Sequence, residues 1–463
     1  MLYEASSGRS DEALEINPLY ARDATNEIPK WKLAESEVLP STAAQIIRDE
    51  LALDGSARLN LATFVSTWME PEARALMADT FDKNMIDKDE YPQTAEIEMR
   101  CVNIISNLWH GSVREGEHAT GCSTTGSSEA SMLAGMALKW RWRAKMRKAS
   151  KPADRPNMVM GINVQVCWEK FCRYWEVEPR FVPMEGDRFH IDPEAAAKLC
   201  DENTIGVVGV LGSTFDGSYE PIEELAEVLD RLESKTGLDI PIHVDAASGG
   251  FVAPFIQPEL KWDFRLKRVC SINASGHKYG LVYPGIGWVV WRNSRFLPAD
   301  LVFKVNYLGG EMPTFALNFS RPGNQVVGQY YNFIRLGFSG YRSVQQECQN
   351  VAMRLSSEIA NLGPFTVLTD GSDLPVFIFA LTNTGGNFTV FDLSERLRDR
   401  GWLVPAYTMP KHREDLAVLR VVVRNGFSHD MADMLLADLK RHLDHFAKLS
   451  APLPSGNRGG FHH

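Results

Sequence analysis

The alternation of short apolar runs with helical segments between residues 59 and 345 constrains the fold of this chain more than any other feature. Apolar residues recur at helical spacing in 97–108, 127–147 and 221–235. The remaining apolar runs are short and rich in strand-forming residues: 158–162, 205–211, 242–244, 269–272 and 287–291. Such runs are typical of strands buried on both faces, so the pattern predicts an α/β fold with a mostly parallel sheet covered by helices. Ligands of such sheets bind at the carboxyl ends of the strands.

A short arm precedes this region. Residues 1–58 mix charges with prolines and contain one helix signal, in which Thr42 can cap the helix, Gln45 completes a capping box and Gly55 ends the helix. An arm of this length cannot bury a core of its own. We therefore expect it to pack on the main body or on a second subunit.

A smaller domain follows the α/β region. Residues 346–463 begin with a helix at 351–362, continue with strands at 376–381 and 416–423, and carry an amphipathic helix capped by Ser428. This order predicts a small C-terminal α+β domain. The chain is expected to divide into three parts: 1–58, 59–345 and 346–463.

The amino-acid composition limits which kinds of binding partner and which cellular compartment can be expected. The 49 Lys and Arg residues against 59 Asp and Glu residues give a net charge of -10, which repels nucleic acid. The cysteines form no Cys-x-x-Cys pair, so we expect reduced thiols and no metal site. No apolar run approaches the ~18 residues of a membrane span, and the N-terminus lacks a signal-peptide layout. We therefore expect a cytoplasmic protein.

Two ionisable residues follow predicted buried strands. Asp245 ends the run 242–244, and Lys278 comes shortly after the run 269–272. A core strand does not end in a carboxylate without a cationic or hydrogen-bonding partner. Taken alone, the two residues fit a structural ion pair as well as they fit a pair of catalytic groups.

A third element favours the catalytic interpretation. Residues 125–129 open a long helix, where free backbone N–H groups, hydroxyls and the positive helix end can hold an anion. By itself, a Gly-Ser turn is more often a helix cap. Together, an anion cradle, a strand-end aspartate and a strand-end lysine match pyridoxal 5'-phosphate. This cofactor needs a phosphate anchor, a carboxylate for the pyridine nitrogen and an amine for the Schiff base.

Several segments carry a resemblance to a known family. They are Gly-Ser-Ser-Glu 126–129, Val-Gln-Val-Cys-Trp-Glu-Lys-Phe 164–171, His-Val-Asp-Ala-Ala 243–247, Ser-Gly-His-Lys 275–278 and Asn-Phe-Ser-Arg-Pro 318–322. Over nearly the whole chain the sequence resembles the pyridoxal-phosphate enzymes of the aspartate aminotransferase fold. Within them it is similar to the group II amino-acid decarboxylases, above all the bacterial glutamate decarboxylases. The resemblance implies a large domain with a mostly parallel seven-stranded sheet and a small C-terminal domain.

The resemblance also implies roles for individual residues. Lys278 would form the Schiff base with the cofactor, Asp245 would pair with its pyridinium nitrogen, and His277 belongs with them in the catalytic site. Without the surrounding motif, Gln165 is equally an ordinary polar residue at a strand end, and Ala247 a residue kept small by packing. The remaining cofactor contacts implied are Ser127, Ser128, Gln165, Thr214, Ala247, Ser275 and, from a neighbouring subunit, Ser320.

A second set of residues would bind the substrate, L-glutamate. The resemblance assigns the distal carboxylate to Thr63, to the backbone of Phe64 and to Asp87 from a facing subunit. It assigns the α-carboxylate to Arg424, which closes the apolar run 419–423. A guanidinium there can clamp a carboxylate, although a surface charge at a strand end gives the same pattern. Asp87 facing a carboxylate requires a shared proton, which implies a preference for mildly acidic conditions.

The implied activity is the decarboxylation of L-glutamate to 4-aminobutyrate and carbon dioxide, a carbon–carbon lyase reaction that consumes a proton. It suggests acid resistance or 4-aminobutyrate metabolism, and the resemblance implies a homo-oligomer whose functional unit is a dimer and whose full assembly is a hexamer. One alternative is another reaction on the same scaffold, by an aromatic or cysteine-sulfinate decarboxylase or an aminotransferase. The other is a catalytically silent scaffold, against which intact Lys278 and Asp245 argue.

The C-terminal tail suggests regulation. His462 is the penultimate residue of a glycine-rich segment, and the resemblance implies that its neutral imidazole closes the site at higher pH. An idle terminus is the alternative. The tail lacks the basic, tryptophan-containing segment with which plant members bind calmodulin, so we expect no calmodulin partner. Membrane association is expected only as a low-pH property.

Overall fold

The computed structural model describes residues 30–35, 37–113, 116–305, 312–451 and 453 of the chain. It forms two compact units, whose boundary in the sequence lies between Leu59 and Asn60.

The first unit contains helix α2 (Pro40–Leu51) and a short 3-10 turn. The helix begins at Pro40, whose ring presets the helical φ and which has no N–H group in need of a cap. The capping box predicted at Thr42 is wrong, because Thr42 already lies within the helix. Gln45 instead donates to Asp49 one turn later, at 2.6 Å.

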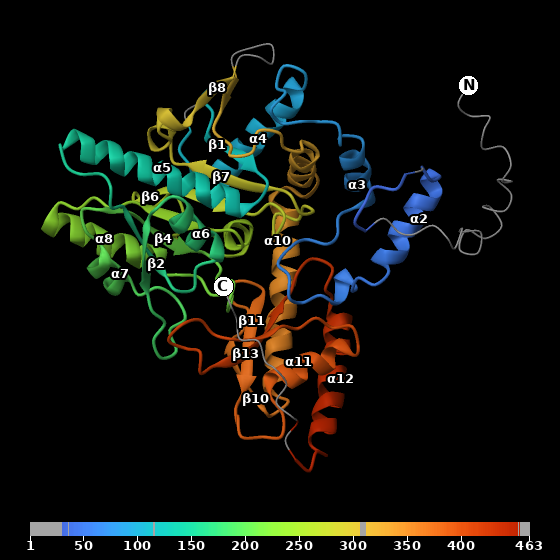
Figure 1. Ribbon diagram of the computed structural model, residues 1–463. Coiled ribbons are helices and arrows are strands. Elements are labelled where there is room, and N and C mark those ends of the chain that lie inside the picture. The colour runs from blue at the N-terminus through green and yellow to red at the C-terminus, as the bar shows by residue number, and fades with distance from the viewer. Residues whose placement is uncertain (1–29, 36, 114–115, 306–311, 452, 454–463) are drawn as a thin grey trace, which may run out of the picture. The chain divides into compact units, whose positions relative to one another are not determined.

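The second unit is built on a seven-stranded sheet with the order β1-β7-β6-β5-β4-β2-β3 (Figure 1). Strand β7 is antiparallel to both of its neighbours, and the other pairs are parallel. The prediction of a mostly parallel seven-stranded sheet is confirmed. The strands are β1 (Thr120–Thr124), β2 (Asn157–Gly161), β3 (Glu178–Val182), β4 (Thr204–Val210), β5 (Ile242–Asp245), β6 (Val269–Ala274) and β7 (Gly287–Trp291).

Helices cover both faces of this sheet. Apolar residues of α5 and α6 pack on one face, and those of α4, α7 and α8 pack on the other. Helix α8 ends at Gly237, which adopts a left-handed φ of 75° as a C-cap, in agreement with the predicted end. The helices of this region are α3 (Pro71–Ala78), α4 (Pro92–Leu108), α5 (Ser127–Lys148), α6 (Val166–Tyr174), α7 (Pro193–Leu199), α8 (Ile222–Thr236) and α9 (Ala253–Ile256).

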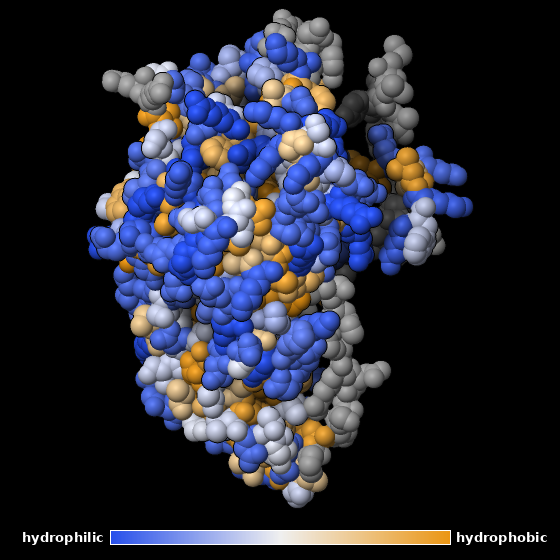
Figure 2. All heavy atoms as spheres, turned by 90° about the vertical axis from the view of Figure 1, so that its left-hand side faces the viewer, coloured by the Kyte–Doolittle hydropathy of each residue, from blue (hydrophilic) through white to orange (hydrophobic). Residues whose placement is uncertain are grey.

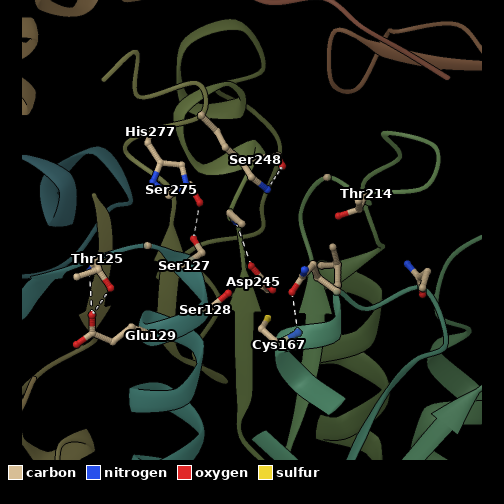
Figure 3. Close-up of a pocket in the computed structure, with 17 residues that line it drawn as sticks. Thr125, Ser127, Ser128, Glu129, Cys167, Thr214, Asp245, Ser248, Ser275 and His277 are labelled. Atoms are coloured by element: carbon tan, nitrogen blue, oxygen red, sulfur yellow. Dashed lines mark hydrogen bonds between the residues drawn. The ribbon is translucent and has the colours of Figure 1, made fainter. Parts of the chain in front are cut away.

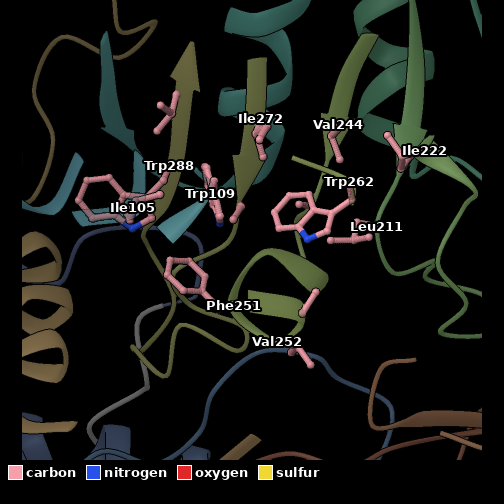
Figure 4. Close-up of a cluster of buried hydrophobic side chains, with 14 of the residues drawn as sticks. Ile105, Trp109, Leu211, Ile222, Val244, Phe251, Val252, Trp262, Ile272 and Trp288 are labelled. Carbon is pink, nitrogen blue, oxygen red and sulfur yellow. The ribbon is translucent and has the colours of Figure 1, made fainter. Parts of the chain in front are cut away.

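Aromatic residues anchor the loop that follows β5 (Figure 4). The Trp109 ring lies 6.2 Å from that of Trp262 and 6.4 Å from that of Phe251, measured between ring centroids. The Trp109 Nε1–H also donates to the carbonyl of Gly250 at 2.9 Å. This packing holds the loop after Asp245 in place, and with it the side chains that the loop carries.

The C-terminal part of the second unit contains an antiparallel sheet with the order β10-β11-β13-β12. The predicted strands and the small C-terminal α+β domain are confirmed. Ser428 stands at the N-cap of the last helix, but its hydroxyl bonds the Asp430 carboxylate, so the predicted side-chain cap is wrong. The elements are β10 (Phe365–Thr369), β11 (Val376–Leu381), α11 (Val390–Arg398), β12 (Ala406–Thr408), β13 (Ala417–Val422) and α12 (His429–Phe446).

Helix α10 (Asn324–Ala360) links the two sheets. The helix predicted at 351–362 is the C-terminal part of α10, and the chain is already helical from Asn324. A kink at Gly337, with a φ of 56°, separates the two halves. Because α10 continues through residue 345, no break in secondary structure marks the domain boundary predicted there. The boundary stays a prediction. A two-stranded ribbon of β8 (Phe303–Val305) and β9 (Met312–Thr314) precedes α10.

The face of the molecule in Figure 2 is mostly hydrophilic, with hydrophobic residues in small scattered groups. Within the described ranges, no helix combines the length and the apolar character that crossing a membrane requires.

Candidate active site

A cavity of about 300 Å³ lies at the carboxyl ends of β4, β5 and β6 (Figure 3). Its lining includes all the residues predicted to hold the cofactor except Ser320. Residues from five separate stretches of the sequence therefore meet at the sheet edge that the α/β pattern indicated. These lining residues are Ser127, Ser128, Gln165, Thr214, Asp245, Ala247, Ser275, His277 and Lys278.

The start of α5 forms one wall of the cavity. As in every α-helix, the N–H groups of its first turn have no intrahelical partner. Within the described structure no side chain at the N-cap position accepts from them. The Ser275 hydroxyl donates to the Ser127 hydroxyl at 2.7 Å, which brings both to this wall. Glu129 accepts from the Thr125 N–H and hydroxyl at 2.8 and 3.0 Å and so fixes the turn that leads into the helix. Free amides, hydroxyls and a helix N-terminus suit a phosphate group.

His277 closes the same wall as a neutral ring. Its Nδ1 accepts from the N–H groups of Gly285 and Ile286 at 3.4 and 3.3 Å. Burial lowers the pKa of the imidazole to about 4, and the neighbouring Lys278 charge adds to this shift. The ring proton therefore resides on Nε2, which leaves that atom as a donor for an anion.

Asp245 forms the floor of the cavity and is 4% exposed. Its Oδ1 accepts from Asn273 Nδ2 at 3.0 Å and from the Ala247 N–H at 3.1 Å. Its Oδ2 accepts from Trp168 Nε1 at 2.8 Å. A carboxylate surrounded by donors accepts hydrogen bonds at both oxygens and has capacity for one more donor.

Lys278 reaches across the cavity towards the loop after β5. Its Nζ donates to the Ser248 hydroxyl at 3.2 Å and lies 5.0 Å from the centroid of the Phe64 ring. Burial lowers the pKa of this amine, and the Asp245 carboxylate opposes the shift. The Lys278 carbonyl accepts from the Ser66 hydroxyl at 2.7 Å, which fixes the backbone. A buried amine with a lowered pKa is a competent nucleophile.

Gln165, Ala247 and Thr214 each have a structural contact besides lining the cavity. Gln165 caps α6, where its Oε1 accepts from the Cys167 N–H at 2.7 Å. The Ala247 N–H donates to Asp245, and the Thr214 carbonyl accepts from the Arg420 guanidinium. Their predicted contacts with the cofactor stay predictions.

The predicted substrate residues and Ser320 lie outside the cavity. Thr63 Oγ1 accepts from the Val65 N–H at 3.1 Å. Arg424 is buried, with its guanidinium on the Thr67 hydroxyl at 2.7 Å and on the Val65 carbonyl at 3.2 Å. Phe64 touches a cavity residue, Lys278, whose Nζ lies over its ring.

Asp87 and Ser320 lie near one another in the structure, and neither lines the cavity. Asn84 connects them, because its carbonyl accepts from the Asp87 N–H at 3.1 Å and its Nδ2 donates to the Ser320 hydroxyl at 3.3 Å. The backbone at Met85 also donates to the Arg321 carbonyl at 2.9 Å. The two residues assigned to a neighbouring subunit thus lie together.

Arg420 is a residue that the sequence analysis missed. Its guanidinium lies 5.0 Å from the centroid of the Phe64 ring and donates to the carbonyls of Thr214 and Ala62. It therefore places a positive charge near Lys278, whose pKa it helps to lower. The signal for it was an arginine within the apolar run 416–423, where a charge is costly unless it is partnered.

The donor set of the cavity fits pyridoxal 5'-phosphate. An anion cradle at α5, a donor-bound carboxylate at Asp245 and a buried amine at Lys278 supply the three contacts that this cofactor requires. Among the residues that the structure describes, no cluster of three or more His, Cys, Asp or Glu side chains could hold a metal ion. His462 lies outside the described residues.

Comparisons with known proteins agree with this chemistry. The profile of the family described as "Pyridoxal-dependent decarboxylase conserved domain" matches residues 33–382. The glutamate decarboxylase of Aliivibrio fischeri is 56% identical over 447 residues, which cover 95% of each chain. That of Lactococcus lactis subsp. cremoris is 47% identical over 460 residues, 98% of each chain.

Solved structures extend the comparison. The glutamate decarboxylase of Lactobacillus brevis is 49% identical, with a TM-score of 0.90 over 94% of this chain and 99% of that one. Catharanthus roseus tryptophan decarboxylase is 15% identical, with a TM-score of 0.75 over 93% and 92% of the two chains. The second likeness shows a shared fold.

Proposed function

The chain belongs to the pyridoxal-dependent decarboxylase family, and we propose that it acts as a glutamate decarboxylase. It converts L-glutamate to 4-aminobutyrate and carbon dioxide and takes up one proton. The observation that carries this function is the meeting of Lys278, Asp245 and the α5 cradle in one cavity. The chain has 56% identity to a glutamate decarboxylase over nearly its full length, against 15% to a tryptophan decarboxylase, which favours glutamate over the aromatic alternative.

The cofactor pyridoxal 5'-phosphate, when bound, supplies an electron sink for the pair of electrons that carbon dioxide leaves behind. Ser127, Ser128, Ser275 and the Nε2–H of His277 would hold its phosphate. Asp245 would keep a proton on the ring nitrogen, and Gln165 and Ala247 would flank the ring with Thr214 nearby. These assignments are supported by the lining of the cavity.

Lys278 carries the covalent chemistry. Burial disfavours its charged form and so favours the neutral amine, whose lone pair would bond the cofactor aldehyde carbon with release of water. Ser248 Oγ, 3.2 Å away, is placed to orient the amine. The clamp of Ser66 on the lysine backbone keeps the side chain directed into the cavity.

Substrate binding would use residues around the Phe64 segment. We assign the distal carboxylate of glutamate to Thr63, the Phe64 backbone and Asp87 from a facing subunit, and the α-carboxylate region to Arg424. Asp87 and Ser320 lie near one another and line no part of their own cavity, which supports a shared site. We accordingly propose a dimer as the functional unit, within a hexamer.

Physiological role and regulation extend the proposal. Because each turnover consumes a proton, we infer a cytoplasmic enzyme of acid resistance or 4-aminobutyrate metabolism, with membrane association confined to low pH. We infer no nucleic-acid or calmodulin partner. Closure of the site by His462 at higher pH stays part of this proposal.

A spectrum of the holoenzyme with and without L-glutamate, coupled to measurement of carbon dioxide release, tests the function. We expect equal amounts of 4-aminobutyrate and carbon dioxide, and much slower turnover of cysteine sulfinate or aromatic amino acids. Formation of 2-oxoglutarate would indicate an aminotransferase. Absence of the visible cofactor band after loading would indicate a silent scaffold.

A further inference from the structure

The carboxylate of Asp245 stands at the end of a chain of buried polar side chains on β5 and β6. The parallel register sets His243 beside Ser271 and Asp245 beside Asn273. Each of these side chains is at most 4% exposed. Buried polar groups are costly unless each donor meets an acceptor, so the direction of every hydrogen bond in the chain can be assigned.

The directions follow from Asp245. A carboxylate can only accept, so the Nδ2 amino group of Asn273 faces Asp245 Oδ1 at 3.0 Å. The Asn273 Oδ1 then faces His243 Nε2 at 2.7 Å, and that nitrogen therefore carries the ring proton. The bare Nδ1 of His243 accepts from the Ser271 hydroxyl at 2.8 Å. Burial supports this neutral form, because it lowers the pKa of His243 to about 4.

Trp168 contacts two members of this series, Asp245 and His243. Its Nε1–H donates to Asp245 Oδ2 at 2.8 Å, and its ring centroid lies 5.1 Å from that of His243. Among the described residues, Oδ2 accepts this single bond, whereas Oδ1 accepts two. The lone pair left for a ligand therefore belongs to Oδ2, in a residue that lines the cavity.

We propose that Trp168, Asn273 and His243 are positioning residues, which fix the rotation of the Asp245 carboxylate and leave Oδ2 free to accept the N–H of the cofactor ring. The proposal rests on the proposed function in requiring pyridoxal 5'-phosphate. It is independent of the amino acid that is decarboxylated. Without these donors the carboxylate can rotate, and the ring nitrogen holds its proton less firmly.

Trp168→Phe tests the donor to Oδ2, because it keeps an aromatic ring and removes the N–H. The holoenzyme is loaded with cofactor labelled with ¹⁵N in the ring, and its ¹⁵N chemical shift and dissociation constant are measured without substrate. We expect a shift towards the unprotonated pyridine value and weaker cofactor binding by about ten-fold, the effect of one lost hydrogen bond to a charged group. The kcat should fall with little change in KM.

Trp402→Phe is the matched control. Trp402 is 1% exposed, and its Nε1–H donates to Asp438 Oδ2 at 2.9 Å, outside the cavity. It loses the same kind of hydrogen bond from an equally buried ring. We expect a lower Tm with an unchanged ¹⁵N shift and unchanged cofactor affinity.

His243→Phe and His243→Gln test the relay through Asn273. The phenylalanine leaves Asn273 Oδ1 without its donor, whereas glutamine offers an N–H in its place. We expect the first variant to move the ¹⁵N shift in the same direction as Trp168→Phe, and the second to restore it at least in part. If these larger changes prevent folding, Ser271→Ala takes their place, because it removes only the hydroxyl that donates to His243 Nδ1. The same ¹⁵N shift is then measured.

A wild-type ¹⁵N shift and cofactor affinity in folded Trp168→Phe and His243→Phe proteins would overturn the proposal, whatever their Tm. Because these readouts need no substrate, their failure is distinguishable from a failure of the proposed function. A protein that binds cofactor as expected but leaves glutamate unchanged would refute the activity and leave the positioning roles intact.

Discussion

At Lys278, burial and charge act in opposite directions on one amine. Burial lowers its pKa, the Asp245 carboxylate opposes the shift, and the Arg420 guanidinium adds to it. The amine is thus kept reactive by its surroundings, and its position is held through Ser248 and Ser66. The reactivity of the Lys278 amine therefore depends on contacts with a few individual side chains.

Lys278→Ala should reduce turnover by at least about a thousand-fold, because it removes the amine that binds the cofactor covalently. Lys139→Ala is the control, since Lys139 is a buried lysine that donates to the Trp175 carbonyl and does not line the cavity. Decarboxylation and far-ultraviolet circular dichroism are measured on both. Substantial turnover by a folded Lys278→Ala protein would contradict the assignment.

His277 should make the stability of the cofactor-free protein depend on pH. Its folded pKa of about 4 lies below the ordinary 6.5, so between these values the unfolded chain binds a proton that the folded chain excludes. This contribution to stability is complete above pH 6.5 and is lost as the pH falls towards 4. Denaturant unfolding of His277→Gln should therefore show a smaller loss of free energy over this window, by up to about 3 kcal/mol. Parallel curves would show that folding leaves the pKa of the His277 ring unchanged.

At the scale of elements, the cavity depends on how closely β7 approaches the start of α5. A Cβ added at Gly287 would lie 2.7 Å from the Ser127 nitrogen, and one added at Gly126 would lie 3.0 Å from the His277 ring. Both positions need glycine for space. The strand can thus present Gly287 directly beneath the helix N-terminus that forms the anion cradle.

Gly287→Ala should push the start of α5 away from β7 and weaken cofactor binding by ten-fold or more, roughly the effect of losing one or two charge-assisted hydrogen bonds. Gly206→Ala is a matched control on β4, where a Cβ would approach the flexible side chain of Leu138 at 3.1 Å. Cofactor dissociation constants are measured by absorbance. Equal affinity in the two variants would refute this role of the close approach.

Strand β13 contributes to the site through Arg420, which ties the Ala62 and Thr214 carbonyls together beside Phe64. Arg420→Met should loosen the segment proposed to bind glutamate and lower kcat/KM by about ten-fold or more, with the cofactor still bound. Arg413→Met is the control, because Arg413 lies over the Phe189 ring, 5.5 Å from its centroid, and donates to the Gly186 carbonyl. Steady-state kinetics distinguish the two. An unchanged kcat/KM in Arg420→Met would remove Arg420 from the site.

At the scale of the whole molecule, the proposed sharing of sites predicts complementation. Mixing inactive Asp87→Ala with inactive Lys278→Ala, under conditions of subunit exchange, should restore up to about a quarter of wild-type activity, because half the sites of a mixed dimer carry neither change. Mixing Lys278→Ala with Asp245→Asn should restore none, since both residues line the same cavity. Proven exchange without recovery in the first mixture would argue against shared sites.

The accuracy of sequence-based prediction differed between elements and contacts. The strands ending at Asp245 and Trp291 were predicted closely, because buried parallel strands leave an uninterrupted apolar run. The caps at Thr42 and Ser428 were wrong. A proline at the helix start and a nearby aspartate each offered the chain a competing local interaction.

The alternating architecture and the residues at the sheet edge could be inferred from the amino-acid sequence, because periodicity and motif are local properties of the chain. The donors that hold Asp245 and the approach of Arg420 to Lys278 could be identified only in the folded protein. The Asp245–Asn273 bond spans 28 positions, and the contact of Ser66 with Lys278 spans 212. Contacts between residues so far apart in the sequence depend on strand order, register and side-chain packing, which are properties of the complete fold.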